Sequence, residues 1–186
     1  MKHLLILAFA AIVVVSCNDK AASSTTATST DSASTVTTPS ETLVYAYTLD
    51  HRYKDWQPGD KKNAVAAMKS LKAYEDGDIA TCVEGFGDTV DLHFDRFFAR
   101  VSNDSLKKMF TSDRAKIAST KVYMEDWESV ISSDKKDEYV TMWYKEVSTD
   151  KNGKTDSIKV VDDVKFVNGK IVELDQKTQH YPAKKM

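Results

Sequence analysis

The chain has 186 residues, and its 26 Lys and Arg against 28 Asp and Glu give a formal net charge of -2. Acidic and basic residues are interspersed, so the sequence lacks the basic stripe of a nucleic-acid-binding domain, and we expect no nucleic-acid partner. The length predicts one folded domain with additional segments.

Residues 1–16 are predicted to be a lipoprotein signal peptide. A short cationic start precedes an apolar run over residues 4–15. This is the length of a signal-peptide core and falls short of the about 20 residues that a membrane-spanning helix needs. The run ends in Val14-Val15-Ser16-Cys17, which resembles the bacterial lipobox.

The lipobox resemblance implies that Cys17 becomes the first residue of the mature protein and carries lipid on its thiol. Two or more acyl chains are enough to hold a protein on a membrane. We therefore expect an exported, lipid-anchored protein of the bacterial cell envelope, in the outer membrane rather than the inner one. The alternative is a non-lipidated signal peptide with an incidental cysteine.

Residues 17–42 are predicted to be the lipid-anchored cysteine followed by a disordered tether. The segment is mostly Ser, Thr and Ala, with one Pro and no aromatic residue, so it cannot bury a core. As a flexible coil of about 25 residues it would reach on the order of 25–30 Å. We interpret it as a spacer.

The folded domain is predicted over residues 43–186. It opens with an aromatic-rich stretch, 43–56, which is either a short strand or an arm packed on the domain. Asp60 is placed to cap a first helix and Gly77 to end it, and Asp78 is placed to cap a second, shorter helix. The apolar residues of the first helix recur at helical spacing and are Ala64, Val65, Met68, Leu71 and Tyr74.

A strand over residues 89–94 and a third helix follow. That helix is predicted to be capped by Ser102 or Asp104 and to have an apolar face of Leu106, Met109, Phe110 and Ile117. The period then changes to two, which predicts four successive strands at 120–131, 139–149, 157–167 and 171–181. Asn168-Gly169 before the last strand is a strong hairpin signal. This order predicts an α+β fold, a curved antiparallel sheet packed against about three N-terminal helices.

Three short motifs in this order carry a resemblance to a known superfamily. They are Gly77-Asp78 between the first two helices, Phe86-x-Asp88 before the first strand, and Asn168-Gly169-Lys170-Ile171 before the last. Over residues 58–181 the chain resembles the SnoaL-like and ketosteroid-isomerase-like superfamily. The resemblance implies the cone-shaped fold of nuclear transport factor 2, with a cavity between the concave sheet and the helices. That fold hosts isomerases, dehydratases, cyclases, ligand carriers and interaction modules, so it does not determine function.

The resemblance also implies where catalytic residues would lie. The isomerases keep a general-base aspartate on the first strand, and this position falls on Phe94, or on Leu92 with a one-residue gap. Their pocket tyrosine on the first helix falls on Ser70. Their second acid, on the penultimate strand, falls on Asp162, the one position that matches. We therefore expect no catalytic residue, and the sequence favours a protein that is not an enzyme over one that is.

Asp162 stands out without any resemblance. Its strand-mates on the same face are all apolar: Ile158, Val160, Val164 and Phe166. A carboxylate on an apolar face is costly unless it is paired or protonated, burial raises its pKa, and such groups are enriched at functional sites. The alternative is a structural acid bonded to the backbone or to Trp127, Trp143 or Tyr144.

We expect a ligand pocket around this acid, with no metal and no cofactor. Its predicted lining residues are Asp162, Tyr144, Trp127, Gln176, His180, Phe94 and Met68. The aromatic members could equally belong to the core or to a dimer interface. Cys82 is predicted to be a lone, buried thiol that behaves as a small apolar side chain.

Three functions remain open. The first is a membrane-anchored envelope lipoprotein whose domain binds a small, largely apolar ligand without catalysis. The second is a homodimeric protein-interaction module with a filled cavity, since related domains pair through the convex side of the sheet. The third is an isomerase or dehydratase that uses Asp162, with a proton acceptor supplied by His180, His51 or Asp126.

Overall fold

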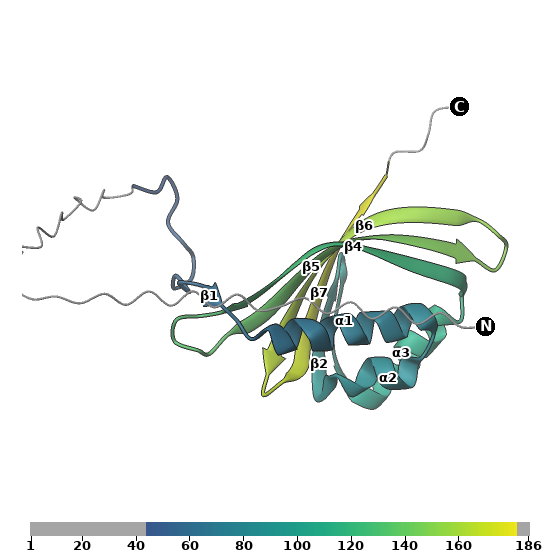
Figure 1. The fold of residues 1–186 in the computed structure, drawn as a ribbon, viewed down its shortest axis with the longest axis horizontal. Helices are drawn as coiled ribbons and strands as arrows, with labels where there is room; N and C mark the ends of the chain where they lie inside the picture. Colours follow the sequence, from purple (N-terminus) through teal and green to yellow (C-terminus); the bar gives the residue numbers. More distant parts are fainter. Residues whose placement is uncertain (1–43, 182–186) are drawn as a thin grey trace, which may run out of the picture. The chain divides into compact units, whose positions relative to one another are not determined.

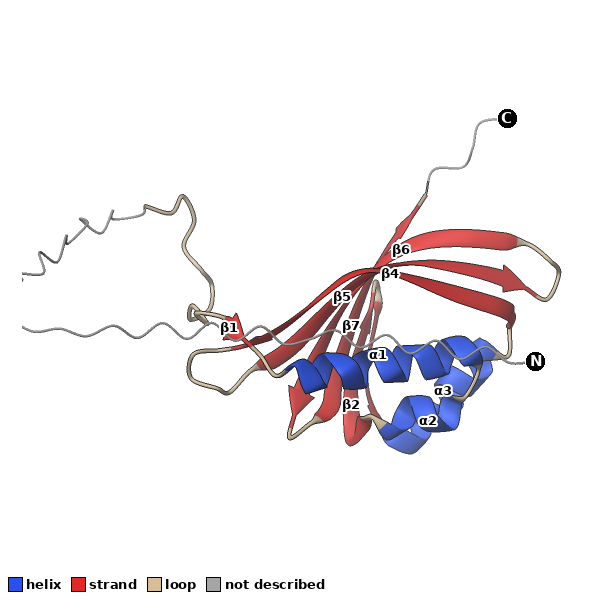
Figure 2. Ribbon diagram, in the orientation of Figure 1, coloured by secondary structure: helices blue, strands red, loops and turns tan. Residues whose placement is uncertain are grey.

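The computed structural model describes residues 44–181, and those from Tyr47 onward form one compact unit. The predicted signal peptide, the lipid site Cys17 and the tether lie outside the described residues. The unit is an α+β domain, a curved open sheet of seven strands with three helices (Figures 1 and 2). No helix within residues 44–181 is long and apolar enough to span a membrane.

The helices begin and end where local capping residues predict. They are α1 (Lys61–Asp76), α2 (Ile79–Glu84) and α3 (Asn103–Arg114). Asp60 accepts a hydrogen bond from the Lys62 amide at 2.8 Å, and Gly77 ends α1 with φ of 82°, a left-handed conformation that glycine adopts without strain. Asp78 and Ser102 cap α2 and α3 in the same way. These capping predictions are confirmed.

The strands are β1 (Gln57–Pro58), β2 (Phe86–Phe94), β3 (Phe97–Ser102), β4 (Ile117–Ile131), β5 (Glu138–Asp150), β6 (Thr155–Val167) and β7 (Lys170–His180). The four predicted strands of the second half are present as β4 to β7. Ile117, however, was assigned to the third helix and instead opens β4. The helix ends at Arg114 because Ala115 and Lys116 close its last turn on the carbonyls of Thr111 and Asp113.

The sheet is mixed rather than antiparallel, which corrects the sequence prediction. Its order is β1-β4-β5-β6-β7-β2-β3, and β2 pairs with β7 in parallel. The reason lies in the connection through α3. This helix carries the chain from β3 to β4, so both strands run the same way, and three further reversals leave β7 parallel to β2. β3 itself was not predicted; it forms a hairpin with β2 around Asp95, whose φ is 47°.

The core lies between the sheet and the helices. Helix α1 contacts β4 and β5, and α3 contacts β2 and β3. The middle of the buried face of α1 is made of small residues, which let the helix lie close to the sheet: Ala64, Ala67, Ser70 and Ala73. The opposing sheet residues are larger and fully buried, including Val90, Leu92, Val140, Val160 and Phe166.

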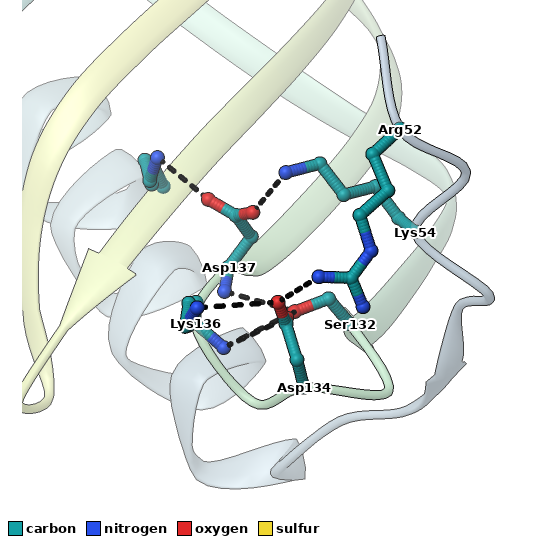
Figure 3. A network of polar contacts seen from close by, with 7 residues as sticks. Arg52, Lys54, Ser132, Asp134, Lys136 and Asp137 are labelled. Carbon is teal, nitrogen blue, oxygen red and sulfur yellow. Dashed lines mark hydrogen bonds and ion pairs between the residues drawn. The ribbon is translucent and has the colours of Figure 1, made fainter. Parts of the chain in front are cut away.

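The arm before α1 is attached to the turn between β4 and β5. Asp137 in that turn accepts from both Lys54 and Lys165, and Arg52 pairs with Asp134 at 3.0 Å (Figure 3). The two residues of β1 add backbone pairing to β4. Gly59 is needed here, since a Cβ would lie 2.7 Å from the Ser129 hydroxyl. The arm is thus held by charge and backbone pairing, and most of its aromatic side chains are exposed.

Candidate functional site

A cavity of about 270 Å³ lies between the helices and the sheet. Its wall is mostly apolar, and helices α1, α2 and α3 and strands β2, β5, β6 and β7 all contribute to it. The lining residues are Ala67, Ser70, Leu71, Tyr74, Cys82, Phe86, Phe94, Phe110, Asp113, Met142, Tyr144, Glu146, Ile158, Asp162, Val164, Ile171, Leu174 and Gln176.

Asp162 lies at the centre of the sheet side of this cavity and is only 3% exposed. Its Oδ2 accepts a hydrogen bond from the Tyr144 hydroxyl at 2.8 Å, and its Oδ1 accepts one from Gln176 Nε2 at 3.1 Å. The register of the strands explains why these three side chains meet. Asp162 is paired with Gln176 on β7 and with Met142 on β5, and Tyr144 follows Met142 by two residues on the same face of β5. Three neighbouring strands therefore each contribute one polar side chain to one point of an apolar wall.

Burial changes the proton affinity of this cluster. It raises the pKa of Asp162 to about 6, although the hydrogen bonds from Tyr144 and Gln176 favour the ionised form. Burial and the neighbouring Asp162 raise the pKa of Tyr144 well above its ordinary value. The hydroxyl of Tyr144 therefore remains a donor, while the carboxyl of Asp162 changes its charge close to neutral pH. The pair can hold a polar group of a ligand in either protonation state.

A second polar group, Glu146, lines the cavity. Glu146 follows Tyr144 by two residues on β5, so both side chains lie on one face of the strand. Its Oε1 accepts from Ser148 at 2.6 Å. Asp113, in the last turn of α3, pairs with Lys116 at 2.6 Å, and its side chain is 56% exposed. Since this exposed residue also lines the cavity, the cavity reaches solvent beside Asp113.

Ser70 and Cys82 line the helical side without a charge. The Ser70 hydroxyl donates to the Cys82 carbonyl at 2.8 Å, which joins α1 to α2. Cys82 is a free, buried cysteine. Burial raises the pKa of its thiol, so the reactive thiolate is disfavoured.

The structure brings four of the seven predicted pocket residues together. Asp162, Tyr144, Gln176 and Phe94 all line the cavity. The other three, Met68, Trp127 and His180, are not among its lining residues.

Geometry explains why each of these three residues lies outside the cavity lining. The α1 residues that line the cavity follow the spacing Ala67, Ser70, Leu71 and Tyr74. Met68 is turned about 100° from Ala67 around the helix and packs beside this face. Trp127 lies on β4 opposite Met142, one strand further from Asp162. The side chain of His180 is 73% exposed and lies 3.7 Å from Asp156.

The positions that the superfamily resemblance assigned to catalysis do meet in space. Phe94, Ser70 and Asp162 all line the cavity, although they come from β2, α1 and β6. Leu92, the alternative for the base position, is fully buried and is not part of the lining. The positions thus face the cavity as the superfamily pattern implies, while the base and the tyrosine are replaced by a phenyl ring and a serine.

Glu146 is one of two charged lining residues, with Asp113, that sequence reasoning missed. The signal was available, since Met142, Tyr144 and Glu146 alternate along one strand and Tyr144 was already in the predicted pocket. Asp113 and Ser70 could not be found in this way, because their approach depends on how the helices pack against the sheet. Within residues 44–181, no group of three or more His, Cys, Asp or Glu side chains is placed to hold a metal ion.

No protein-family model matches the chain, and no curated protein is similar to it in sequence. Solved structures do resemble it. An NTF2-like protein of unknown function from Burkholderia pseudomallei superposes with a TM-score of 0.51 at 14% identity, covering 63% of this chain and 91% of that one. The epoxide hydrolase/cyclase-like enzyme SalBIII, which has a role in pyran ring formation in the polyether salinomycin, gives 0.53 at 16% identity, over 64% and 92% of the two chains. TerC, co-crystallized with polyporic acid, gives 0.52 at 14% identity, over 63% and 92%.

These likenesses concern the fold. The domain has the SnoaL-like, NTF2-like fold, as the sequence motifs predicted. Its structural neighbours include both enzymes and a protein crystallized with an organic ligand. At this level of identity the choice between binding and catalysis has to come from the residues of the cavity itself.

Proposed function

We propose that this domain binds one small, largely apolar molecule in the cavity and holds it, without chemical change, against the Asp162–Tyr144 pair. The observation that carries the proposal is a cavity of about 270 Å³ whose wall includes Asp162, an acidic residue that is only 3% exposed. An acid in such a place costs stability, and a binding role gives a reason for keeping it.

The size and wall of the cavity support a small ligand. Pockets for drug-sized molecules occupy about 300 to 1,000 Å³ and combine an apolar wall with a few convergent polar groups. This cavity lies just below that range, which suits a molecule of one or two rings. The polar groups at its centre are two acceptors, the carboxyl group of Asp162 and the oxygen of Tyr144, whose one proton is donated to Asp162. The proposal includes the cone-shaped enclosure that the superfamily resemblance implies, with the ligand between sheet and helices.

The absence of catalysis is supported by the residues at the expected catalytic positions. Phe94 cannot accept a proton, and Ser70 already donates to a backbone carbonyl. The proton acceptors that an enzyme based on Asp162 would need, His180, His51 or Asp126, do not line the cavity. An interaction module with a filled cavity fits less well, because space for a ligand is present.

The test is uptake of a neutral apolar probe, naphthylmethanol, by the purified chain in native mass spectrometry. We expect one probe per chain for the natural protein and none for Leu174→Trp, which fills the cavity from β7. The matched control is Gln179→Trp, on the same strand but on the opposite, exposed face, which should bind as the natural protein does. Equal uptake by all three proteins would refute the proposal, as would no uptake by any.

We also propose that the domain is anchored in the bacterial cell envelope through lipidated Cys17 and that it forms a homodimer. The lipobox-like sequence that ends at Cys17 supports the anchor. The superfamily resemblance supports the dimer, through the convex face of the sheet. The same mass spectra report whether the chain is present as one copy or two.

A further inference from the structure

The charges that line the cavity all have one sign. Among the eighteen lining residues the ionisable acids are Asp113, Glu146 and Asp162, and there is no Lys, Arg or His. This is unlike the rest of the domain, whose net charge is nearly balanced and whose surface carboxylates are often paired with lysines, such as Lys177 with Asp163 and Lys159 with Glu125.

Of the three lining carboxylates, Glu146 has the fewest hydrogen bonds and ion pairs to offset its negative charge. Asp113 is paired with Lys116, and Asp162 accepts two hydrogen bonds. Glu146 is half-buried, accepts one hydrogen bond from Ser148, and forms no ion pair with any side chain in residues 44–181. Its negative charge is felt across the cavity, because it contributes to raising the pKa of three other lining residues, Tyr74, Tyr144 and Asp162.

Two aromatic rings line the same cavity. Tyr74 and Phe110 both line it and meet edge to face with ring centroids 5.6 Å apart. The face of an aromatic ring attracts a cation, most strongly where water is excluded. A carboxylate that forms no ion pair, in a cavity that two aromatic rings also line, is the chemistry that recognises an alkylammonium group.

We propose that the ligand of this cavity is a cationic amine, a small aromatic or aliphatic molecule with one protonated nitrogen. Its ammonium group lies at Glu146, in a cavity that the rings of Tyr74 and Phe110 also line, and its apolar body extends along the wall toward Asp162. The inference rests on the proposed function, since it names the chemical class of the molecule that the cavity holds.

The same charges select against other ligands. An anion would enter a space that is lined by Asp113, Glu146 and Asp162 and by no Lys, Arg or His, and like charges in a partly desolvated site repel strongly. A neutral molecule gains the apolar contacts but not the attraction to Glu146. Binding should therefore be strongest for the cation, intermediate for the neutral molecule and weakest for the anion.

The experiment compares three probes of similar size by isothermal titration calorimetry with the purified full chain at neutral pH. They are naphthylmethylammonium, naphthylmethanol and naphthoate, which carry a positive charge, no charge and a negative charge. We expect the ammonium to bind about tenfold or more tightly than the alcohol, a difference of about 1.4 kcal/mol, and the carboxylate not to bind measurably.

Two variants test whether Glu146 causes the preference for the ammonium probe. Glu146→Gln should reduce the affinity for the ammonium by about tenfold while leaving that for the alcohol within about twofold. Glu125→Gln, a surface carboxylate paired with Lys159 and away from the cavity, should change neither.

The outcomes separate the inference from the function it rests on. If the alcohol binds and the ammonium binds no more tightly, or if Glu146→Gln keeps the preference, the cationic ligand is refuted and the apolar binding site stands. If no probe binds to the natural protein, both are refuted.

Discussion

Asp162→Asn should stabilise the domain at pH 8 and have little effect at pH 4. The substitution keeps the shape of the side chain and removes its charge. Tyr144 can still donate to the Asn oxygen, and Gln176 can turn its amide so that its oxygen accepts from the new NH2 group. The variant no longer bears the free-energy cost of burying an ionised carboxylate in the folded state, where Asp162 is only 3% exposed.

The magnitude follows from the pKa of this group. Burial raises the pKa of Asp162 from 3.8 to about 6, and each unit of difference corresponds to about 1.36 kcal/mol. Because the folded state binds the proton more tightly than the unfolded chain, stability is highest below pH 3.8 and is lost as the pH rises through about 6. The total loss is about 3 kcal/mol, so at pH 8 the variant should melt roughly 5–10 °C higher than the natural protein.

Thermal unfolding of both proteins at the two pH values measures this difference. The matched control is Asp163→Asn, the next residue, whose side chain lies on the other face of β6 and pairs with Lys177 at 2.8 Å. Removing that exposed pair should cost less than about 1 kcal/mol. If Asp162→Asn instead lowers the melting temperature at pH 8, the carboxylate is a stabilising structural acceptor, and our explanation of its presence is wrong.

Three further predictions concern other parts of the chain. Asp137→Asn should destabilise the domain by about 1 kcal/mol at pH 7, because hydrogen bonds from Lys54 and Lys165 lower the pKa of Asp137. The difference in stability between the variant and the natural protein should shrink below about pH 3.8, as the natural side chain takes up a proton. A stability difference that does not depend on pH would contradict this prediction. Cys17→Ala should abolish labelling by a fatty-acid probe and release the protein from membranes in a high-salt wash, and continued labelling would exclude the anchor. Deleting residues 20–40 should leave the melting temperature of the domain nearly unchanged, and a loss above about 1 kcal/mol would show that the predicted spacer packs on the domain.

The helix ends of this domain are predictable from sequence because capping is local. Asp60, Gly77 and Asp78 act on backbone groups within a few residues of themselves, so no knowledge of the tertiary fold is needed. The hairpin of β6 and β7 is predictable for the same reason, since Asn168-Gly169 sets its turn.

Features that depend on distant parts of the chain were missed. The pairing of β2 with β7 joins residues about eighty positions apart, such as Leu92 and Leu174, and no local pattern gives its direction. The residues of the candidate site likewise fall into those that a local pattern predicts and those that depend on tertiary packing. Asp162 is found from its apolar strand-mates, whereas the approach of Asp113 from α3 depends on how the helix packs. His180 is not among the lining residues, because alternation on β7 gives the face of a residue but not where the cavity ends.

The most direct test of the central claim is an NMR measurement of where a bound probe lies. We expect naphthylmethanol, added to methyl-labelled protein, to show intermolecular NOEs to the methyl groups of Met142, Val164 and Leu174, which line the cavity, while its own resonances stay those of the unchanged alcohol. NOEs only to methyl groups outside the cavity, or new resonances from a product, would contradict a binding site that holds its ligand without catalysis.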